Sequence, residues 1–357
     1  MTAKQKKIQF WGSISLIIFS FTLSLLLADG LIRIFLPQPL SGTWRVLSDS
    51  GYLINKSGNT VRHQLGNRVV QYRFNDFHLR GGPIQPQIPK ILVVGDSYTF
   101  GWLLAEHDTY AYHLQKYINR DLGKETFQVL NGGAGGWGTL DYLAFIEEFG
   151  KKINPAIIVV FLNADDIGRS IKGGTQKEVK LSKLKSFVNS LPFYEWLLEN
   201  SHLVQFLRNI ILGQAQAPSV QNKSSIPIPG SYDLQISQEE ATNLGQTLFH
   251  RLKAWCDKHE VRLFVLTTGW HFKSEQEQEK YIEPTRAFMM KAEEIFQKEN
   301  IPYHDITPEV LLTINGQLED FVIPGDGHPN ERGSKLIADR AWLWLAPHLK
   351  KMLPVHK

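Results

Sequence analysis

The stretch ILVVGDSYTFG at residues 91–101 predicts a buried β-strand that runs directly into a turn and a helix. Four apolar residues, three of them β-branched, form the strand, and Gly95-Asp96-Ser97 ends it. Ser97 would then lie at the carboxyl end of the strand, where open α/β sheets place their active sites. Backbone N–H groups and the helix dipole favour developing negative charge at that point. Ser97 is therefore a candidate nucleophile, with the alternative that it only caps the helix.

A second polar cluster lies far down the chain, in PGDGHPNERG at residues 324–333. A serine nucleophile needs a base, and the base needs a carboxylate that orients it. His328 and Asp326 supply both residue types two positions apart, in a loop that precedes a predicted helix. Ser97, His328 and Asp326 are therefore the candidate catalytic residues.

Strand and helix patterns alternate from Lys90 onward, which predicts an α/β fold with a doubly wound parallel sheet in three layers. The expected strands are Ile91–Val94, Phe127–Leu130, Ala156–Leu162, Arg262–Thr267 and Tyr303–Ile306. The expected helices are Thr109–Asp121, Leu140–Ile153, Gln238–His259, Glu279–Asn300 and Gly333–Lys350. Right-handed crossovers bring the carboxyl ends of such strands to one edge, where the segments that follow them can meet.

These motifs resemble those of the SGNH, or GDSL-type, esterases and acyltransferases. Gly95-Asp96-Ser97 matches the first family block, NGGAGG at residues 131–136 the second, and DGHPN at residues 326–330 the last. The resemblance covers the chain from Lys90 onward, apart from an insertion. It implies a flavodoxin-like SGNH fold and an acyl-serine mechanism without a cofactor or metal. In that mechanism Ser97 attacks, His328 is the base and Asp326 orients the imidazole.

Two positions depart from the family pattern. The carboxylate usually stands three residues before the histidine, where this chain has Gly325, so a backbone carbonyl is the alternative to Asp326 as the orienting group. The third block, usually Gly-x-Asn-Asp, is here Asn163-Ala-Asp165-Asp166. The resemblance implies three oxyanion donors: the N–H groups of Ser97 and Gly136 and an asparagine amide. An ionised Asp165 would oppose an oxyanion, so we expect Asn163 to supply the amide, unless Asp165 is protonated or turned away.

The first 36 residues predict a membrane anchor. Lys4, Lys6 and Lys7 precede an uncharged apolar run from Ile8 to Leu27, which is long enough to span a bilayer. We expect an uncleaved helix rather than a removed signal peptide, with its amino end in the cytoplasm. The catalytic domain would then be extracytoplasmic, either periplasmic or on the cell surface.

The rest of the chain divides into a connector and a catalytic domain. Residues 37–89 form a connector with short β segments, and residues 90–357 form the catalytic domain. Residues 169–235 interrupt the alternation and predict an insertion of helices and loop. In the connector, residues 75–82 resemble a family segment in which His78 replaces the usual glycine.

Composition limits the other function classes. The net charge of +4 over 357 residues and the lack of a basic run interleaved with aromatics do not indicate nucleic acid. The single cysteine, Cys256, excludes an internal disulfide and a thiolate metal cage, and its helical context predicts a packed residue.

Three alternatives to an esterase stay open at this stage. Gly133–Gly138 fits the G-x-G-x-x-G dinucleotide fingerprint, although it follows the second strand and lacks the expected acidic partner. His304, Asp305, Asp326 and His328 could in principle bind a metal, but their spacing matches no recognised ligand pattern. The altered third block also allows a catalytically inactive binding protein. The function we predict is a membrane-anchored serine esterase or O-acyltransferase for acyl or acetyl esters of a cell-envelope glycan or lipid.

Overall fold

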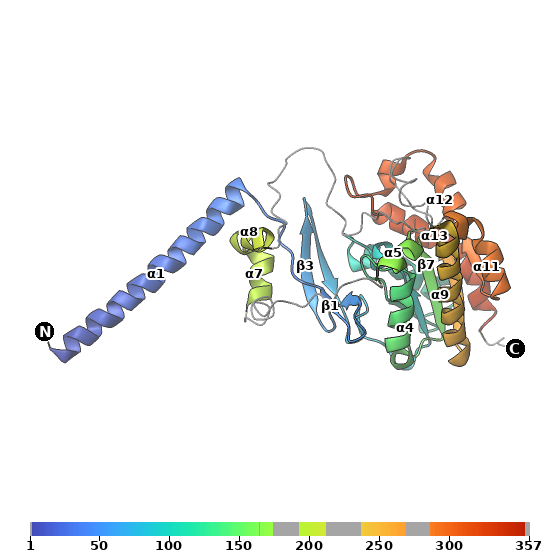
Figure 1. Cartoon of the computed structure of the whole chain (residues 1–357), viewed down its shortest axis with the longest axis horizontal. Coiled ribbons are helices and arrows are strands. Elements are labelled where there is room, and N and C mark those ends of the chain that lie inside the picture. The colour runs from blue at the N-terminus through green and yellow to red at the C-terminus, as the bar shows by residue number, and fades with distance from the viewer. Residues whose placement is uncertain (1, 164, 174–192, 212–236, 269–285, 354–357) are drawn as a thin grey trace. The chain divides into compact units, whose positions relative to one another are not determined.

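The computed structural model describes residues 2–163, 165–173, 193–211, 237–268 and 286–353. The chain divides into two compact units. The first unit comprises residues 1–43, 61–69 and 181–223, and the second comprises residues 44–60, 70–180 and 224–357. Figure 1 shows the chain coloured from blue at the N-terminus to red at the C-terminus, with several elements of each unit labelled.

The described residues of the first unit form one long helix and two short ones. These are α1 (Ala3–Phe35), α7 (Tyr194–Asn200) and α8 (His202–Ile211). Within α1, Lys7–Phe35 is long and apolar enough to cross a membrane, and none of its most apolar window is buried. The predicted apolar helix near the N-terminus is therefore present, and it is the one such helix among the described residues. Helices α7 and α8 fall within the predicted insertion, whose residues 174–192 and 212–236 lie outside the described residues.

Short strands occupy the predicted connector. Strand β1 (Arg45–Leu47) pairs antiparallel with β2 (Leu53–Asn55). Strands β3 (Thr60–Leu65) and β4 (Arg68–Arg73) form a second two-stranded sheet.

The second unit is built on a five-stranded parallel sheet with strand order β6-β5-β7-β8-β9. Its strands are β5 (Lys90–Val94), β6 (Gln128–Asn131), β7 (Ile157–Leu162), β8 (Arg262–Thr267) and β9 (Tyr303–Asp305). Counted along this sheet the order is 2-1-3-4-5, which is the flavodoxin-like order. The predicted α/β fold with a doubly wound parallel sheet is confirmed.

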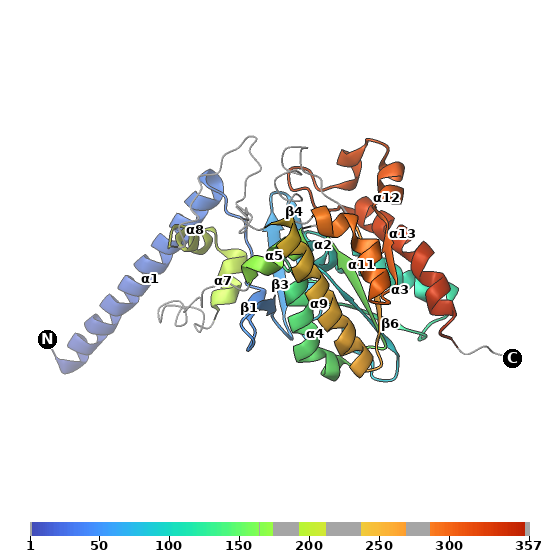
Figure 2. The ribbon, with the colours of Figure 1, turned by 45° about the vertical axis from the view of Figure 1, so that its right-hand side comes forward.

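Helices cover both faces of this sheet (Figure 2). The described helices of this unit are α2 (Ser97–Phe100), η1 (Glu106–Asp108), α3 (Tyr110–Asp121), α4 (Thr139–Ile153), α5 (Asp166–Gly173), α9 (Gln238–Lys258), α11 (Ala292–Lys298), α12 (Thr307–Ile314), η2 (Leu318–Phe321) and α13 (Glu331–Lys350). The helix expected over Glu279–Asn300 includes α11, and its first residues lie outside the described chain.

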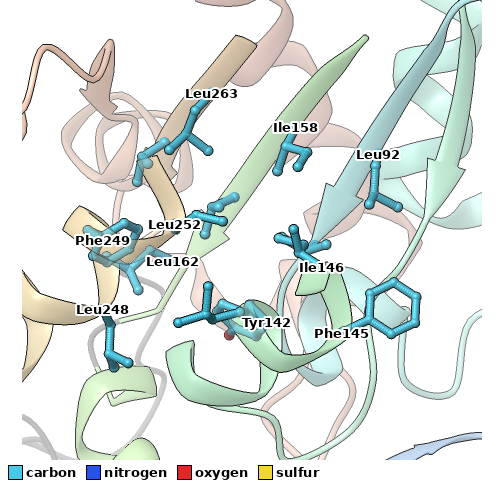
Figure 3. Packing of buried hydrophobic residues seen from close by; sticks show 14 of the residues in the cluster. Leu92, Tyr142, Phe145, Ile146, Ile158, Leu162, Leu248, Phe249, Leu252 and Leu263 are labelled. Atoms are coloured by element: carbon cyan, nitrogen blue, oxygen red, sulfur yellow. The ribbon is translucent and has the colours of Figure 1, made fainter. Parts of the chain in front are cut away.

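Successive side chains of each buried strand point to opposite faces of the sheet, so a hydrophobic core forms on each face. From β5, Leu92 and Val94 pack with side chains of α4, α9 and α11, and Figure 3 shows this cluster around Leu92, Ile146 and Phe249. The alternate residues of β5 pack with α3 and α13 on the other face. Each fully buried large aliphatic side chain contributes about 1.5–3 kcal/mol, so the two cores stabilise this sheet.

Cys256 is a packed residue, as predicted. It lies in α9 within the cluster on the α4 side of the sheet and is fully buried. Burial raises the pKa of its thiol to about 12, so the thiol stays protonated at neutral pH.

We predict that Gly133→Ala destabilises the fold and lowers activity. A Cβ at Gly133 would lie 2.3 Å from the Phe100 backbone nitrogen and 2.7 Å from the Thr99 carbonyl carbon, so α2 must shift. Overpacking of this kind costs about 1–3 kcal/mol. Gly135→Ala is the matched control, because a Cβ there meets no atom within 4 Å. Urea unfolding of both variants checks the prediction, and equal stabilities would contradict it.

Candidate active site

Ser97 is the first residue of α2, directly after strand β5. Asp96, not Ser97, caps this helix, because its Oδ1 accepts a hydrogen bond from the Tyr98 backbone nitrogen at 2.8 Å. The alternative interpretation of Ser97 as the helix cap is therefore wrong. Its hydroxyl instead donates to Nε2 of His328 at 2.8 Å, across 231 residues of sequence.

His328 links this hydroxyl to a carboxylate. With Nδ1 protonated, His328 donates to Oδ1 of Asp326 at 2.5 Å. Gly327 lies between them at φ +86°, a backbone conformation that lets the Asp326 side chain fold back onto an imidazole only two residues away. Asp326, rather than a backbone carbonyl, is thus the group that contacts Nδ1. The structure brings Ser97, His328 and Asp326 into one hydrogen-bonded chain.

Trp102 supports the carboxylate from the other side. Its indole Nε1 donates to Oδ2 of Asp326 at 3.1 Å. Burial raises the pKa of Asp326, but the hydrogen bond and charge of His328 and the hydrogen bond of Trp102 outweigh burial and lower this pKa below its ordinary value. The carboxylate is therefore ionised at neutral pH. The Tyr98 ring packs edge-on against the imidazole, with ring centroids 5.0 Å apart, and restricts its rotation.

The second block forms a glycine loop after β6. Gly136 has φ +79°, which glycine adopts without strain. The neighbouring Gly135 carbonyl accepts a hydrogen bond from Nη1 of Arg45 at 2.9 Å. This carbonyl and the Gly136 N–H belong to the same peptide plane, so Arg45 fixes the direction of that N–H. The first and second blocks are joined by Asn131, whose amide donates to the Thr99 carbonyl at 2.8 Å.

The third block follows β7. Oδ1 of Asn163 accepts a hydrogen bond from the Thr268 hydroxyl at 2.5 Å, which leaves the amide nitrogen as the donor end of the side chain. The Asn163 backbone nitrogen donates to Oδ2 of Asp166 at 2.7 Å. Asp165 is engaged elsewhere: its Oδ2 lies 2.5 Å from Nη2 of Arg169.

Arg169 of α5 contacts all three of these segments. Its Nη1 donates to Oδ2 of Asp96 at 2.9 Å, beside Ser97, and to the Trp137 carbonyl at 3.3 Å, beside Gly136. It also lies 3.7 Å from Asp166. Burial alone lowers the pKa of Arg169, but the surrounding carboxylates raise it well above its ordinary value, so the guanidinium stays charged.

The same carboxylates are the one set of acidic side chains in the described residues whose geometry could hold a metal ion. Ligand atoms of Asp96, Asp165 and Asp166 lie within 4.8 Å of one another. The guanidinium of Arg169 contacts each of them and supplies the positive charge there.

The alternative metal site at the C-terminal loop is not assembled. His304 contacts Glu309, with Nε2 3.1 Å from Oε1, and Asp305 accepts from the Thr307 backbone nitrogen at 2.9 Å. Asp326 and His328 contact each other instead.

The glycines of the dinucleotide fingerprint serve packing. A Cβ at Gly138 would lie 2.4 Å from the Asp166 carbonyl oxygen, and Gly133 packs against α2. Amides at the start of α4 are already bonded, since the Gly138 nitrogen donates to Asp141 and the Leu140 nitrogen donates to Ser170. A pyrophosphate needs those amides, so the structure does not favour a dinucleotide site.

A cavity of about 450 Å³ lies away from these residues. Its walls come from the segment 73–88 and from α3 and β6, and Ser97 and His328 do not line it. It is therefore separate from the candidate active site.

Residues 93–336 match the GDSL-like Lipase/Acylhydrolase family. The chain belongs to this family. The match spans more than half of the chain and includes Ser97, Gly136, Asn163 and His328. The enzyme class is accordingly that of an SGNH-type ester hydrolase. None of the curated proteins matches the chain.

Solved esterases of low identity resemble the chain. The psychrotrophic esterase EstA from Pseudoalteromonas sp. has 12% identity and a TM-score of 0.42, over 73% of this chain and 98% of its own. A mutant acetyl-xylooligosaccharide esterase from Geobacillus Stearmophilus has 12% identity and a TM-score of 0.43, over 72% and 95%. A two-domain esterase active on acetylated mannans has 14% identity and a TM-score of 0.41, over 74% and 50%. Similarity at this level does not define a substrate for this family member.

Sequence reasoning missed the residues that support this GDSL-type site. Arg169 stands four residues after Asp165, which is the spacing of an ion pair on one helix face. The sequence alone therefore indicates this ion pair. Arg45, Trp102 and Thr268 act through contacts between distant segments, and no local pattern marks them.

We predict that Asp326→Asn lowers kcat about 10³–10⁴-fold, because an amide no longer holds the Nδ1-protonated tautomer or stabilises the imidazolium. The matched control is Asp320→Asn, which changes an exposed carboxylate of η2 paired with Arg332 at 3.1 Å. Steady-state hydrolysis of a nitrophenyl ester measures both variants. A kcat for Asp326→Asn near that of the control would reject the role of Asp326.

We predict that the effect of Asp326→Asn on thermal stability depends on pH. The native pKa of Asp326 lies below its ordinary value, so ionised Asp326 stabilises the fold above an unfolded-state pKa of about 3.9. That stabilisation is lost as pH falls through the native pKa. The difference in Tm between wild type and Asp326→Asn should therefore be present at pH 7 and shrink below about pH 4.

Proposed function

We propose that this family member is a serine esterase or O-acyltransferase that works through an acyl-serine intermediate outside the cytoplasm. The observation that carries the proposal is the contact of 2.8 Å between the Ser97 hydroxyl and Nε2 of His328. A neutral imidazole at that distance can accept the hydroxyl proton as the oxygen attacks. The further contact to Asp326 gives the imidazole an ionised partner.

The reaction proceeds in two halves. Ser97 Oγ attacks the ester carbonyl while His328 takes its proton, and the resulting imidazolium is stabilised by Asp326. His328 then protonates the leaving alcohol, and an acyl-Ser97 ester forms. Water or a sugar hydroxyl, deprotonated by His328, then attacks the carbonyl of this ester. His328 returns the proton to Ser97 Oγ as the acyl–serine bond breaks, which releases the acid or the new ester and restores Ser97. Hydrolysis and acyl transfer differ only in that second acceptor.

The oxyanion is held by the N–H groups of Ser97 and Gly136 and by the Asn163 amide. Arg45 supports this assignment because it fixes the peptide that carries the Gly136 N–H. Thr268 supports it because it binds the carbonyl end of the Asn163 amide. Donors that are oriented in advance lose no energy to reorganisation when the oxyanion forms.

Arg169 explains how the site tolerates Asp165 in a position where the family has asparagine. The 2.5 Å contact places the charge of Arg169 against the carboxylate, in surroundings where both side chains are mostly buried. Opposite charges this close cancel most of each other's field at a third group. The negative charge of Asp165 is thereby kept from opposing the oxyanion.

We propose that α1 anchors the enzyme in a membrane. Its segment Lys7–Phe35 has the necessary length and apolarity. Lysines at positions 4, 6 and 7 favour a cytoplasmic amino end, which leaves the rest of the chain on the periplasmic or cell-surface side. The substrates within reach there are acyl or acetyl esters of cell-envelope glycans and of lipids.

We predict that Ser97 becomes acylated. Full-length protein in detergent, incubated with a short and a long nitrophenyl ester, should gain the mass of one acyl group on the peptide containing Ser97. Ser97→Ala and His328→Ala should both abolish this gain and lower turnover at least 10³-fold. A fluorophosphonate probe should label wild type only. Absence of acylation and labelling in folded wild type would favour the inactive binding protein, the alternative suggested by Asp165.

We predict opposite outcomes for two neighbouring residues of the third block. Asn163→Ala should lower kcat about 10²–10³-fold with little change in KM, since it removes a donor used mainly in the transition state. Asp165→Asn should stay within about tenfold of wild type, because the charge of Arg169 already offsets the charge of this carboxylate at the oxyanion. A kcat for Asn163→Ala near that of wild type would reject Asn163 as the oxyanion donor.

Arg169→Gln provides the test of charge compensation. It should lower kcat by exposing the oxyanion to Asp165, and the double variant with Asp165→Asn should recover part of that loss. A purely structural role for Arg169 predicts no recovery. Circular dichroism of each variant separates loss of folding from loss of activity.

A further inference from the structure

Helix α8 turns its polar side chains toward the protein. His202 and Gln205 are buried, and Asn209 continues the same face one turn later. The Gln38 backbone nitrogen donates to Nδ1 of His202 at 2.8 Å, Gln205 Nε2 donates to the Ser41 carbonyl at 2.7 Å, and Asn209 Nδ2 donates to Gln38 Oε1 at 3.2 Å. These hydrogen bonds fix the rotation of α8 about its axis.

The opposite face of α8 is apolar and uncovered in the described residues. Leu207, Ile210 and Ile211 lie on one side of the helix and are 47%, 48% and 76% exposed. An amphipathic helix on a water-soluble protein packs its apolar face inward. Helix α8 has the reverse arrangement, and exposure of its apolar face to water is energetically unfavourable.

Helix α7 also exposes apolar side chains while two of its glutamates are held by hydrogen bonds, although its Leu198 is buried. Glu195 and Glu199 accept hydrogen bonds from the backbone nitrogens of Thr43 at 3.4 Å and Arg62 at 3.0 Å. Between these glutamates, Trp196 is 60% exposed, and Phe193 at the start of the helix is 78% exposed. Phe193 and Trp196 of α7 and Leu207, Ile210 and Ile211 of α8 are thus exposed apolar side chains, and we call these five together the apolar face of α7–α8.

This face belongs to a helix pair that is fastened to the last turns of α1. Oδ1 of Asp29 accepts hydrogen bonds from the Leu203 backbone nitrogen at 2.9 Å and from the Ser201 hydroxyl at 2.8 Å, so a carboxylate of α1 caps α8. Arg33 Nη2 donates to the Asn200 carbonyl at 3.3 Å. An unpaired carboxylate near the end of an apolar span is costly in lipid, and α8 supplies its partners.

We propose that the apolar face of α7–α8 lies in the membrane interface, at the boundary of the lipid headgroups and acyl chains. The inference rests on the proposed anchoring by α1. Asp29 and Arg33 join α8 to the end of the span, the level at which α1 leaves the bilayer. The five side chains of the face are apolar or aromatic and none is charged. Tryptophan favours that interface, and such helices bury their apolar face about 5–10 Å into it.

Site-directed fluorescence in vesicles tests this placement. Full-length Cys256→Ala protein receives one cysteine at Trp196, Leu207 or Ile210, labelled with the polarity-sensitive dye NBD. The vesicles contain phosphatidylcholine and phosphatidylglycerol, with nitroxide lipids labelled either near the headgroup or deep in the acyl chain. We expect the NBD emission of labels at these three positions to be shifted to the blue relative to the same labels in unfolded protein. We also expect the shallow nitroxide to quench this emission more strongly than the deep nitroxide does. Ile18→Cys on α1 reports the span, and Leu312→Cys, an exposed leucine of α12, is the matched control.

The two proposals fail in different ways. Quenching of Ile18 by the deep nitroxide without quenching at Leu207 or Ile210 rejects the interfacial face while leaving the anchor intact. No quenching at Ile18 rejects the anchor, and with it the face. Equal quenching at Leu312 contradicts a lipid contact specific to α7–α8. Protection of the labels from both nitroxides and from aqueous iodide means that other segments of the chain cover the face, which also overturns the inference.

Discussion

The buried charge of Arg169 is the interaction on which the active-site edge depends. A guanidinium removed from water is costly unless it is paired, and removal of one partner of a buried pair costs about 3–5 kcal/mol. Here it contacts Asp96 beside the nucleophile, the carbonyl beside Gly136, and Asp165 in the third block. One side chain therefore sets the relative positions of three loops that share no sequence neighbourhood.

Burial and neighbouring charges in this cluster of Arg169 and carboxylates also shift the pKa of one carboxyl group. Burial raises the pKa of Asp166 well above its ordinary value, and the charge of Asp96 adds to the effect. Asp166 thus holds a proton more readily than an ordinary carboxyl does, and its Oδ2 accepts a hydrogen bond from the Tyr142 hydroxyl at 2.5 Å. Burial of several carboxylates at the sheet edge is costly unless they are paired with a positive charge. The guanidinium of Arg169 supplies that charge for all three of them.

Much of the fold and the core of the candidate site could be predicted from the sequence, because both depend on local patterns. Alternating strands and helices determine a parallel sheet, and a parallel sheet gathers the segments after its strands at one edge. The meeting of Ser97 and His328 follows from that constraint. The supporting residues could not be predicted in the same way, because Arg45, Trp102 and Thr268 bond across 90, 224 and 105 residues respectively. His78 is an intermediate case, since its φ of +63° explains why the family favours glycine there.

The α7–α8 pair shows a different limit of sequence reasoning. Apolar residues at helical spacing predict a helix with one apolar face, but the period is the same whether that face meets a protein core or a lipid. Packing is the commoner use, and the sequence offers no reason to reject it. The structure distinguishes the two cases through Gln205 and Glu199. Both side chains form hydrogen bonds with backbone groups of the connector, and these bonds hold the polar faces of the two helices inward. Those hydrogen bonds fix the rotation of the helices, so Trp196, Leu207 and Ile210 are left on the exposed side, whereas Leu198 is buried.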